Sequence, residues 1–139
     1  MKIDLAKRGS AIKPMNGVNN GPIGGGVRKT YGNFETYKDA CITFARNHDA
    51  SFNPRYGLEH TVDVHAVFPN FDADPEDPAN YDFACTDDAI LTCLEAGTET
   101  FFRLGQTIEH QIKKHGTVPP KDFKKWAVIC EHIIRHYNE

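Results

Sequence analysis

The sequence predicts an α/β protein built on a small parallel sheet. Three short segments rich in apolar, β-branched or aromatic residues cover 12–20, 42–46 and 98–104. Segments with a helical spacing of apolar residues lie between them and after the last one. Strands that alternate with helices in this way are typical of parallel βαβ units with right-handed crossovers. A chain of 139 residues is long enough for one domain with one core.

The first unit begins with IKPMNGVNN, residues 12–20, which we expect to form a short strand that runs into a turn. The glycine-rich stretch 21–26 follows, and it lacks the glycine spacing of phosphate-binding and dinucleotide-binding loops. Asn33 is placed to cap a short helix over 34–41. This helix leads into the second strand, 42–46.

A long loop follows the second strand, because no new helical pattern begins until about Thr86. Loops of this length inside a compact domain are uncommon and are usually functional or disordered. Within the loop, the alternating segment 61–68, TVDVHAVF, is predicted to form a small extra strand or one arm of a hairpin. Ligands of parallel α/β proteins bind at the carboxyl ends of the strands. The polar end of the second strand and its loop are therefore the first candidate binding site, with Asp49 and His65 as candidate contacts.

The C-terminal half supplies two more helices with a strand between them. Thr86 is predicted to cap the first of these helices, and Gly97 is predicted to end it. The third strand, 98–104, follows directly. Pro119 and Pro120 precede the last helix. Its apolar stripe has spacings of three and four and consists of Phe123, Trp126, Ala127, Cys130, Ile133, Ile134 and Tyr137.

Two features predict an incomplete sheet. Three parallel strands leave two open edges, and parallel sheets are normally covered on both faces. The last helix continues to Glu139 without a capping signal. We therefore expect residues 1–139 to be a single partial domain, the start of a larger α/β fold that is cut off after its third βα unit.

Composition and charge exclude several classes of partner. The net charge is −3 and no basic arm or stripe is present, so we expect no nucleic-acid partner. No apolar run approaches the roughly 18 residues of a membrane helix, so we expect no membrane partner. The N-terminus has no apolar signal-peptide core, which favours a cytoplasmic location. The four cysteines form no CxxC pair, and we expect them to be reduced and structural.

Two clusters of residues that can bind metals lack the spacing that metal sites require. His60, Asp63 and His65 show no tight ligand spacing, which favours hydrogen bonds that fix the loop over a zinc site. The acidic residues of 72–77 lack the pattern of a calcium loop, which favours a solvated turn. We therefore predict no metal and no cofactor.

Two arginines, Arg46 and Arg103, end neighbouring predicted strands. Such side chains could clamp a ligand, or they could point inward and pair with Asp or Glu. The sequence leaves both interpretations open.

Four pieces of the sequence together resemble one enzyme family. They are IKPMNGVNNGP (12–22), FARNHDA (44–50), EHTVDVHAVFPNFDADP (59–75) and TVPPKDFKKWAVICEHIIRHYNE (117–139). They resemble the N-terminal part of glycoside hydrolase family 39, which contains β-xylosidases. Because the family's catalytic domain is a (β/α)8 TIM barrel, the resemblance implies that this chain is the first three βα units of an incomplete barrel.

The resemblance also implies which parts of the enzyme are present. The family is retaining and uses two glutamates, which follow strands four and seven of the barrel. The Asn138-Glu139 pair lies at the end of the last helix with no Pro after it, so it does not match the acid/base motif. We therefore predict no catalytic residue in this chain and no activity by itself. The residues that the resemblance assigns to the sugar-binding wall are His48 and, as weaker matches, Asn19, Asn20 and Gln106.

The leading hypothesis is an N-terminal fragment of a retaining glycoside hydrolase that resembles β-xylosidases, with a terminal β-xyloside or similar glycoside as its carbohydrate partner. An alternative is a non-catalytic carbohydrate-binding or assembly module, which forms a homo-oligomer or pairs with a complementing barrel fragment to cover its open edges. A third hypothesis is a stand-alone small α/β enzyme, for which the sequence offers no acid/base pair with a supporting spacing.

Overall fold

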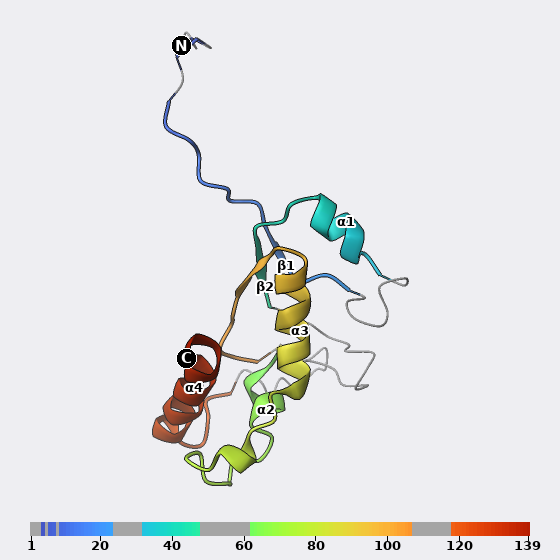
Figure 1. Ribbon diagram of the computed structural model, residues 1–139. Helices are drawn as coiled ribbons and strands as arrows, with labels where there is room; N and C mark the ends of the chain where they lie inside the picture. Colours follow the sequence, from blue (N-terminus) through green and yellow to red (C-terminus); the bar gives the residue numbers. More distant parts are fainter. Residues whose placement is uncertain (1–3, 5, 8, 24–31, 48–61, 107–117) are drawn as a thin grey trace.

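The computed structural model describes residues 4, 6–7, 9–23, 32–47, 62–106 and 118–139. At its centre is a parallel sheet with the strand order β1-β2-β3. The strands are β1 (Gly17–Asn19), β2 (Phe44–Arg46) and β3 (Glu99–Phe101). This arrangement confirms the predicted parallel α/β architecture, although each strand is shorter than the segment that predicted it. The described residues before β1 extend away from the sheet (Figure 1).

The register of the strands defines two faces of the sheet. The three rows of neighbouring residues are Gly17, Phe44 and Glu99; Val18, Ala45 and Thr100; and Asn19, Arg46 and Phe101. Successive residues of a strand point to opposite faces. Ala45 in the middle row is 1% exposed, whereas Phe101 in the last row is 65% exposed. In the described part of the chain, therefore, one face is covered and the other is open beside β3.

Helix α4 (Phe123–Asn138) carries the centre of the core. Asp122 caps it by accepting hydrogen bonds from the backbone N–H groups of Lys124 and Lys125 at 2.8 and 3.1 Å. Ile129 and Ile133 are 0% and 1% exposed. They pack with Val64, Val67 and Phe68, and Trp126 covers this cluster as predicted for a core residue.

Within the alternating segment, the described residues 62–68 contain no strand, so the prediction of a strand or hairpin arm is wrong. Residues Val64–Val67 form a short helix, α2. Val64, Val67 and Phe68 have the spacing i, i+3, i+4, so one helical turn places all three on the same side. That side packs against α4. Burial of this face explains why the segment is helical although its apolar residues alternate.

Helix α3 (Ala84–Glu95) starts earlier than predicted and packs against β3 (Figure 1). The prediction that Thr86 caps it is wrong, because Phe83 occupies the N-cap position and Thr86 is buried within the first turn. Asp82 accepts a hydrogen bond from the Ala84 N–H at 3.0 Å instead. Gly97 follows the helix with φ +79°, a conformation that favours glycine, which confirms its predicted role as a helix stop.

Two shorter helices complete the described fold. Helix α1 (Phe34–Asp39) has Asn33 at its N-cap position, but the Asn33 side chain accepts a hydrogen bond from the Ile23 N–H at 2.7 Å rather than from the helix. The 3-10 helix η2 (Pro78–Asn80) is capped by Asp77. It precedes α3 in the chain and lies on the same side of the fold as α4 (Figure 1).

All four cysteines are free, and Cys41 is exposed. Burial raises the pKa of the Cys85, Cys93 and Cys130 thiols, all of which lie on α3 or α4. They therefore remain protonated and act as small apolar residues. Across the described ranges, every helix is too short or too polar to span a membrane.

Candidate functional site

The carboxyl ends of the three strands meet at one edge of the sheet, where polar residues gather. Asn19 ends β1 and Arg46 ends β2, and Arg46 Nη1 lies 3.5 Å from Asn19 Oδ1. The backbone of Asn20 turns away from the sheet with φ 65°, and its N–H donates to the Arg46 carbonyl at 2.8 Å. Asparagine tolerates this left-handed conformation better than most residues. The local sequence therefore places two carboxamides at the end of β1.

Asn47 joins the ends of β2 and β3. It is 6% exposed, and its N–H donates to the Phe101 carbonyl at 3.3 Å. Its Oδ1 accepts the backbone N–H of Arg103. These two hydrogen bonds hold β2 and β3 together just after their last paired residues. They therefore fix the position at which the chain leaves β3.

An ion pair then connects β3 to α2. Arg103 Nη2 donates to Asp63 Oδ1, and their side chains are 17% and 0% exposed. Arg103 Nη1 also donates to the Gln106 carbonyl at 2.6 Å, and the Val64 N–H donates to the Gly105 carbonyl at 3.0 Å. This confirms the interpretation that an arginine at a strand end pairs with an acidic residue. It argues against a ligand clamp by Arg103.

Tyr37 of α1 approaches the same edge from the other side. Its hydroxyl donates to the Asn20 carbonyl at 3.3 Å. Burial is the main cause that raises the Tyr37 pKa to about 12. The hydroxyl is therefore neutral over the physiological range and serves as a hydrogen-bond donor to the turn after β1.

The structure describes four of the six predicted contact residues. His48 and Asp49 lie outside the described residues. Asn19 and Asn20 lie at the edge beside Arg46. Gln106 and His65 lie on the two sides of the Arg103–Asp63 pair: the Gln106 carbonyl accepts from Arg103, and His65 Nδ1 is 3.9 Å from Asp63 Oδ2. The His65 side chain is 52% exposed, so it remains accessible.

Asn47 and Asp63 are the structural residues of this edge that the sequence did not single out as site residues. Asn47 follows directly after the second predicted strand, and this position was the available signal. The sequence favoured a loop-fixing hydrogen bond over a metal ligand for Asp63, and its carboxylate is paired with Arg103. Among the described residues, no group of three or more His, Cys, Asp or Glu side chains is arranged to hold a metal ion.

The described edge is suited to recognising neutral polar groups. Its side chains include carboxamides and an imidazole, which donate and accept hydrogen bonds without a fixed charge, and the Arg46 guanidinium beside Asn19, which is a charged donor. The one carboxylate of the network, Asp63, is fully buried and bound to Arg103, so it is not presented to a substrate. The arrangement can position a hydroxyl-bearing ligand. Within the described residues it presents no acid/base pair.

Comparison with known proteins finds a similarity to a solved structure. No protein-family model matches the chain, and no curated protein sequence matches it. Among solved structures, the chain is similar to a glucosidase from Croceicoccus marinus, with a TM-score of 0.57 and 25% sequence identity. The match covers 74% of this chain and 20% of that glucosidase, so the chain spans about one fifth of its length. The similarity supports a glycosidase-like fold for this mixed α/β chain without assigning a particular glycosidase family.

Proposed function

We propose that this chain is the N-terminal part of a retaining glycoside hydrolase and supplies part of the sugar-binding wall but not the catalytic glutamates. The observation that carries the proposal is the similarity to one fifth of a glucosidase. The parallel sheet with sequential strand order is consistent with the first three βα units of a (β/α)8 barrel. In such barrels the substrate binds at the carboxyl ends of the strands, which is where the polar edge lies.

The proposed substrate is a terminal β-xyloside or a similar glycoside. The neutral donors and acceptors of Asn19, Asn20 and Gln106 suit sugar hydroxyls. His65 can add an imidazole at the rim of the same edge. The resemblance to family 39 implies that His48 contacts the hydroxyls of the terminal sugar. The same resemblance favours xylose over glucose as that sugar.

Two measurements on the purified chain test this proposal. An aryl β-xyloside and an aryl β-glucoside should release no more phenol with the chain than without it. NMR titration with xylose should shift the side-chain amide signals of Asn19 and Gln106 in a saturable way. Hydrolysis of either glycoside would show that the catalytic groups lie within these residues and would overturn the proposal.

A matched pair of variants makes the binding test specific. Asn19→Ala removes a carboxamide from the sheet edge and should weaken xylose binding by about fivefold or more, the typical worth of one hydrogen bond. Asn138→Ala removes a carboxamide from the last turn of α4, where it donates to the Ile134 carbonyl, and should leave the affinity unchanged. Equal losses in both variants would count against an edge site.

The alternative, an assembly module, is favoured by the open face and edges of the sheet. In the described part of the chain, β1 and β3 are the edge strands and Phe101 is 65% exposed. A second copy or a complementing barrel fragment could cover this surface. In sedimentation experiments, Phe101→Ser should dissociate such an oligomer. Phe123→Ser, at a phenylalanine of α4 that is 68% exposed, should not. If the unsubstituted chain sediments as a monomer, the homo-oligomer is excluded.

A further inference from the structure

A hollow lies between the segment 78–83 and the C-terminal half of α4. Its volume is about 380 Å³. One wall is apolar and comprises Pro78, Tyr81 and Phe83. The other wall is polar and comprises His132, Arg135, His136 and Glu139, whose spacing i, i+3, i+4, i+7 places them on one face of the helix. The hollow shares no residue with the sheet edge described above.

The apolar wall is held in a defined geometry. Tyr81 has an extended backbone, so Tyr81 and Phe83 project to the same side. Their ring planes differ by 5°, with centroids 5.8 Å apart. The Tyr81 hydroxyl donates to the Pro75 carbonyl at 2.7 Å, and the His136 ring stacks on Phe83 at 3.7 Å. The rings are therefore fixed before any ligand arrives.

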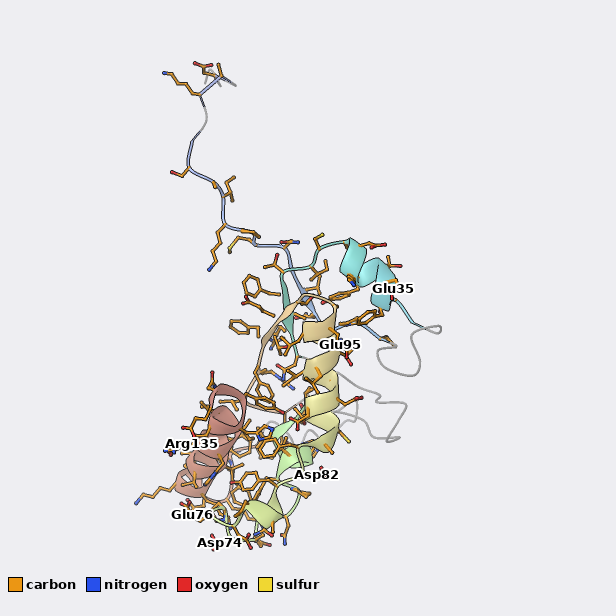
Figure 2. The ribbon with its side chains drawn as sticks, in the orientation of Figure 1. Glu35, Asp74, Glu76, Asp82, Glu95 and Arg135 are labelled. Atoms are coloured by element: carbon orange, nitrogen blue, oxygen red, sulfur yellow. The ribbon has the colours of Figure 1, made fainter. Side chains whose placement is uncertain are left out.

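The basic side chains of the polar wall all lie beside carboxylates. His132 Nε2 lies 3.1 Å from Glu76 Oε2, and His136 Nε2 lies 2.9 Å from Asp87 Oδ1. Arg135 pairs with Glu131 at 2.8 Å and with Glu139 at 3.8 Å. Figure 2 shows Arg135 on α4 and Glu76 in the loop below it. Every basic side chain that lines the hollow thus has at least one carboxylate beside it, and the carboxylates outnumber the basic groups.

The apolar wall and the polar wall together restrict the class of ligand that the hollow can bind. An anion such as phosphate would compete with the carboxylates that already hold the two histidines and the arginine. A hydrocarbon would remove water from the polar wall and offer no hydrogen bonds in return, which is costly. A sugar ring has an apolar C–H surface and a rim of uncharged hydroxyls, so it complements both walls.

We propose that this hollow is a second saccharide-binding site, for a neutral sugar of about one or two rings, the lower end of the size range of ligand pockets. Arg135 and His132 contribute hydrogen bonds to hydroxyls, and Tyr81 with Phe83 contacts the apolar surface of the ring. The inference goes beyond the proposed function and does not depend on it, since none of these residues belongs to the sheet edge.

The test is an NMR titration of the chain with xylobiose and with cellobiose. Saturable shifts of the Tyr81 and His132 ring signals are expected for at least one of the two sugars. Arg135→Ala should weaken this affinity by about fivefold, the worth of one lost hydrogen bond. Lys124→Ala removes a charged side chain from the first turn of the same helix, outside the hollow, and should change nothing.

The outcomes separate this site from the sheet edge. Shifts at the hollow without shifts at Asn19 and Gln106 would support the second site while removing the proposed substrate wall. Shifts confined to Asn19 and Gln106, or no saturation up to the solubility limit of both sugars, would overturn the second site. Tighter binding of inorganic phosphate than of either disaccharide at the Tyr81 and His132 signals would also overturn it.

Discussion

The buried ion pair between Arg103 and Asp63 makes a strong prediction about stability. Replacing Arg103 by Met keeps most of the side-chain volume and removes the guanidinium. The Asp63 carboxylate, which is 0% exposed, then loses its cation, and the Gln106 carbonyl loses a donor at 2.6 Å. Nothing in the substitution lets water reach the carboxylate, because the residues around it are unchanged.

The expected cost follows from the burial of the remaining charge. Removing one partner of a buried pair typically destabilises a protein by about 3–5 kcal/mol. The four-atom apolar stem of Met recovers little, because the Arg103 stem is already packed and only 17% of its side chain is exposed. Arg135→Met supplies the matched control, since Arg135 and its partner Glu131 are more than half exposed and their separation should leave the unfolding free energy unchanged within error.

Urea unfolding followed by circular dichroism measures both changes. Adding Asp63→Asn to Arg103→Met should restore at least about 1 kcal/mol, because the buried negative charge disappears while the amide oxygen is kept. Two results would refute the reasoning. One is a loss below about 1 kcal/mol for Arg103→Met. The other is a further loss, rather than a gain, when Asp63→Asn is added.

Three other predictions address the core, a close contact and alkaline pH. Ile129→Ala should cost about 2–5 kcal/mol in urea unfolding because Ile129 is 0% exposed, whereas Ile134→Ala, at a residue 48% exposed, should cost about 0.5 kcal/mol. A methyl group on Gly21 would overlap Cys93 Sγ, so Gly21→Ala should cost about 1–3 kcal/mol. The double variant with Cys93→Ala should cost less than the sum of the two single changes, and strict additivity would contradict the contact. Burial raises the Tyr81 pKa from 10.0 to about 12, so the unfolded chain loses this proton first. Stability should therefore be complete below pH 10 and fall as the pH rises towards 12, and Tyr81→Phe should reduce this fall in pH-dependent melts.

The elements with strong local signals were predictable from the sequence. The helical period of the apolar residues in α4 predicted the helix and the burial of Ile133. The predicted stripe omitted Ile129, which is 0% exposed, and included Phe123 and Ile134, which are 68% and 48% exposed. Gly97 marks the end of α3 because only glycine adopts φ +79° without strain. The parallel direction of the strands follows from the helices between them, since a parallel pair needs a crossover connection.

The errors occur where tertiary contacts outweigh a local pattern. Four residues of alternation at 64–67 do not distinguish a strand from a helical turn, and contact with α4 selects the turn. Thr86 has the chemistry of a cap, but the chain enters the helix earlier, where Asp82 already accepts from Ala84. The core then buries Thr86 to 1% exposure. In both cases the contact that determines the structure comes from a residue outside the short stretch of sequence on which the prediction was based.

For the two sites as well, single residues could be recognised from the sequence, whereas the contacts between distant segments could not. The position of Asn47 after a strand is visible in the sequence, but its link to Arg103 spans 56 residues and appears only when β2 and β3 pair. The hollow is less predictable still, because its apolar wall at 78–83 and its polar wall on α4 are about as far apart in the chain. Each wall alone has an ordinary interpretation, a proline-aromatic turn and a charged helix face. Their chemical environment depends on the carboxylates of Glu76 and Asp87, which lie beside His132 and His136 only after α4 docks. Next to the sheet edge, folding pairs Arg103 with Asp63, and at the hollow it places a carboxylate beside each basic side chain. The proposals for both sites therefore rest on hydrogen-bonding groups and ring faces, which suit an uncharged ligand that carries hydroxyl groups.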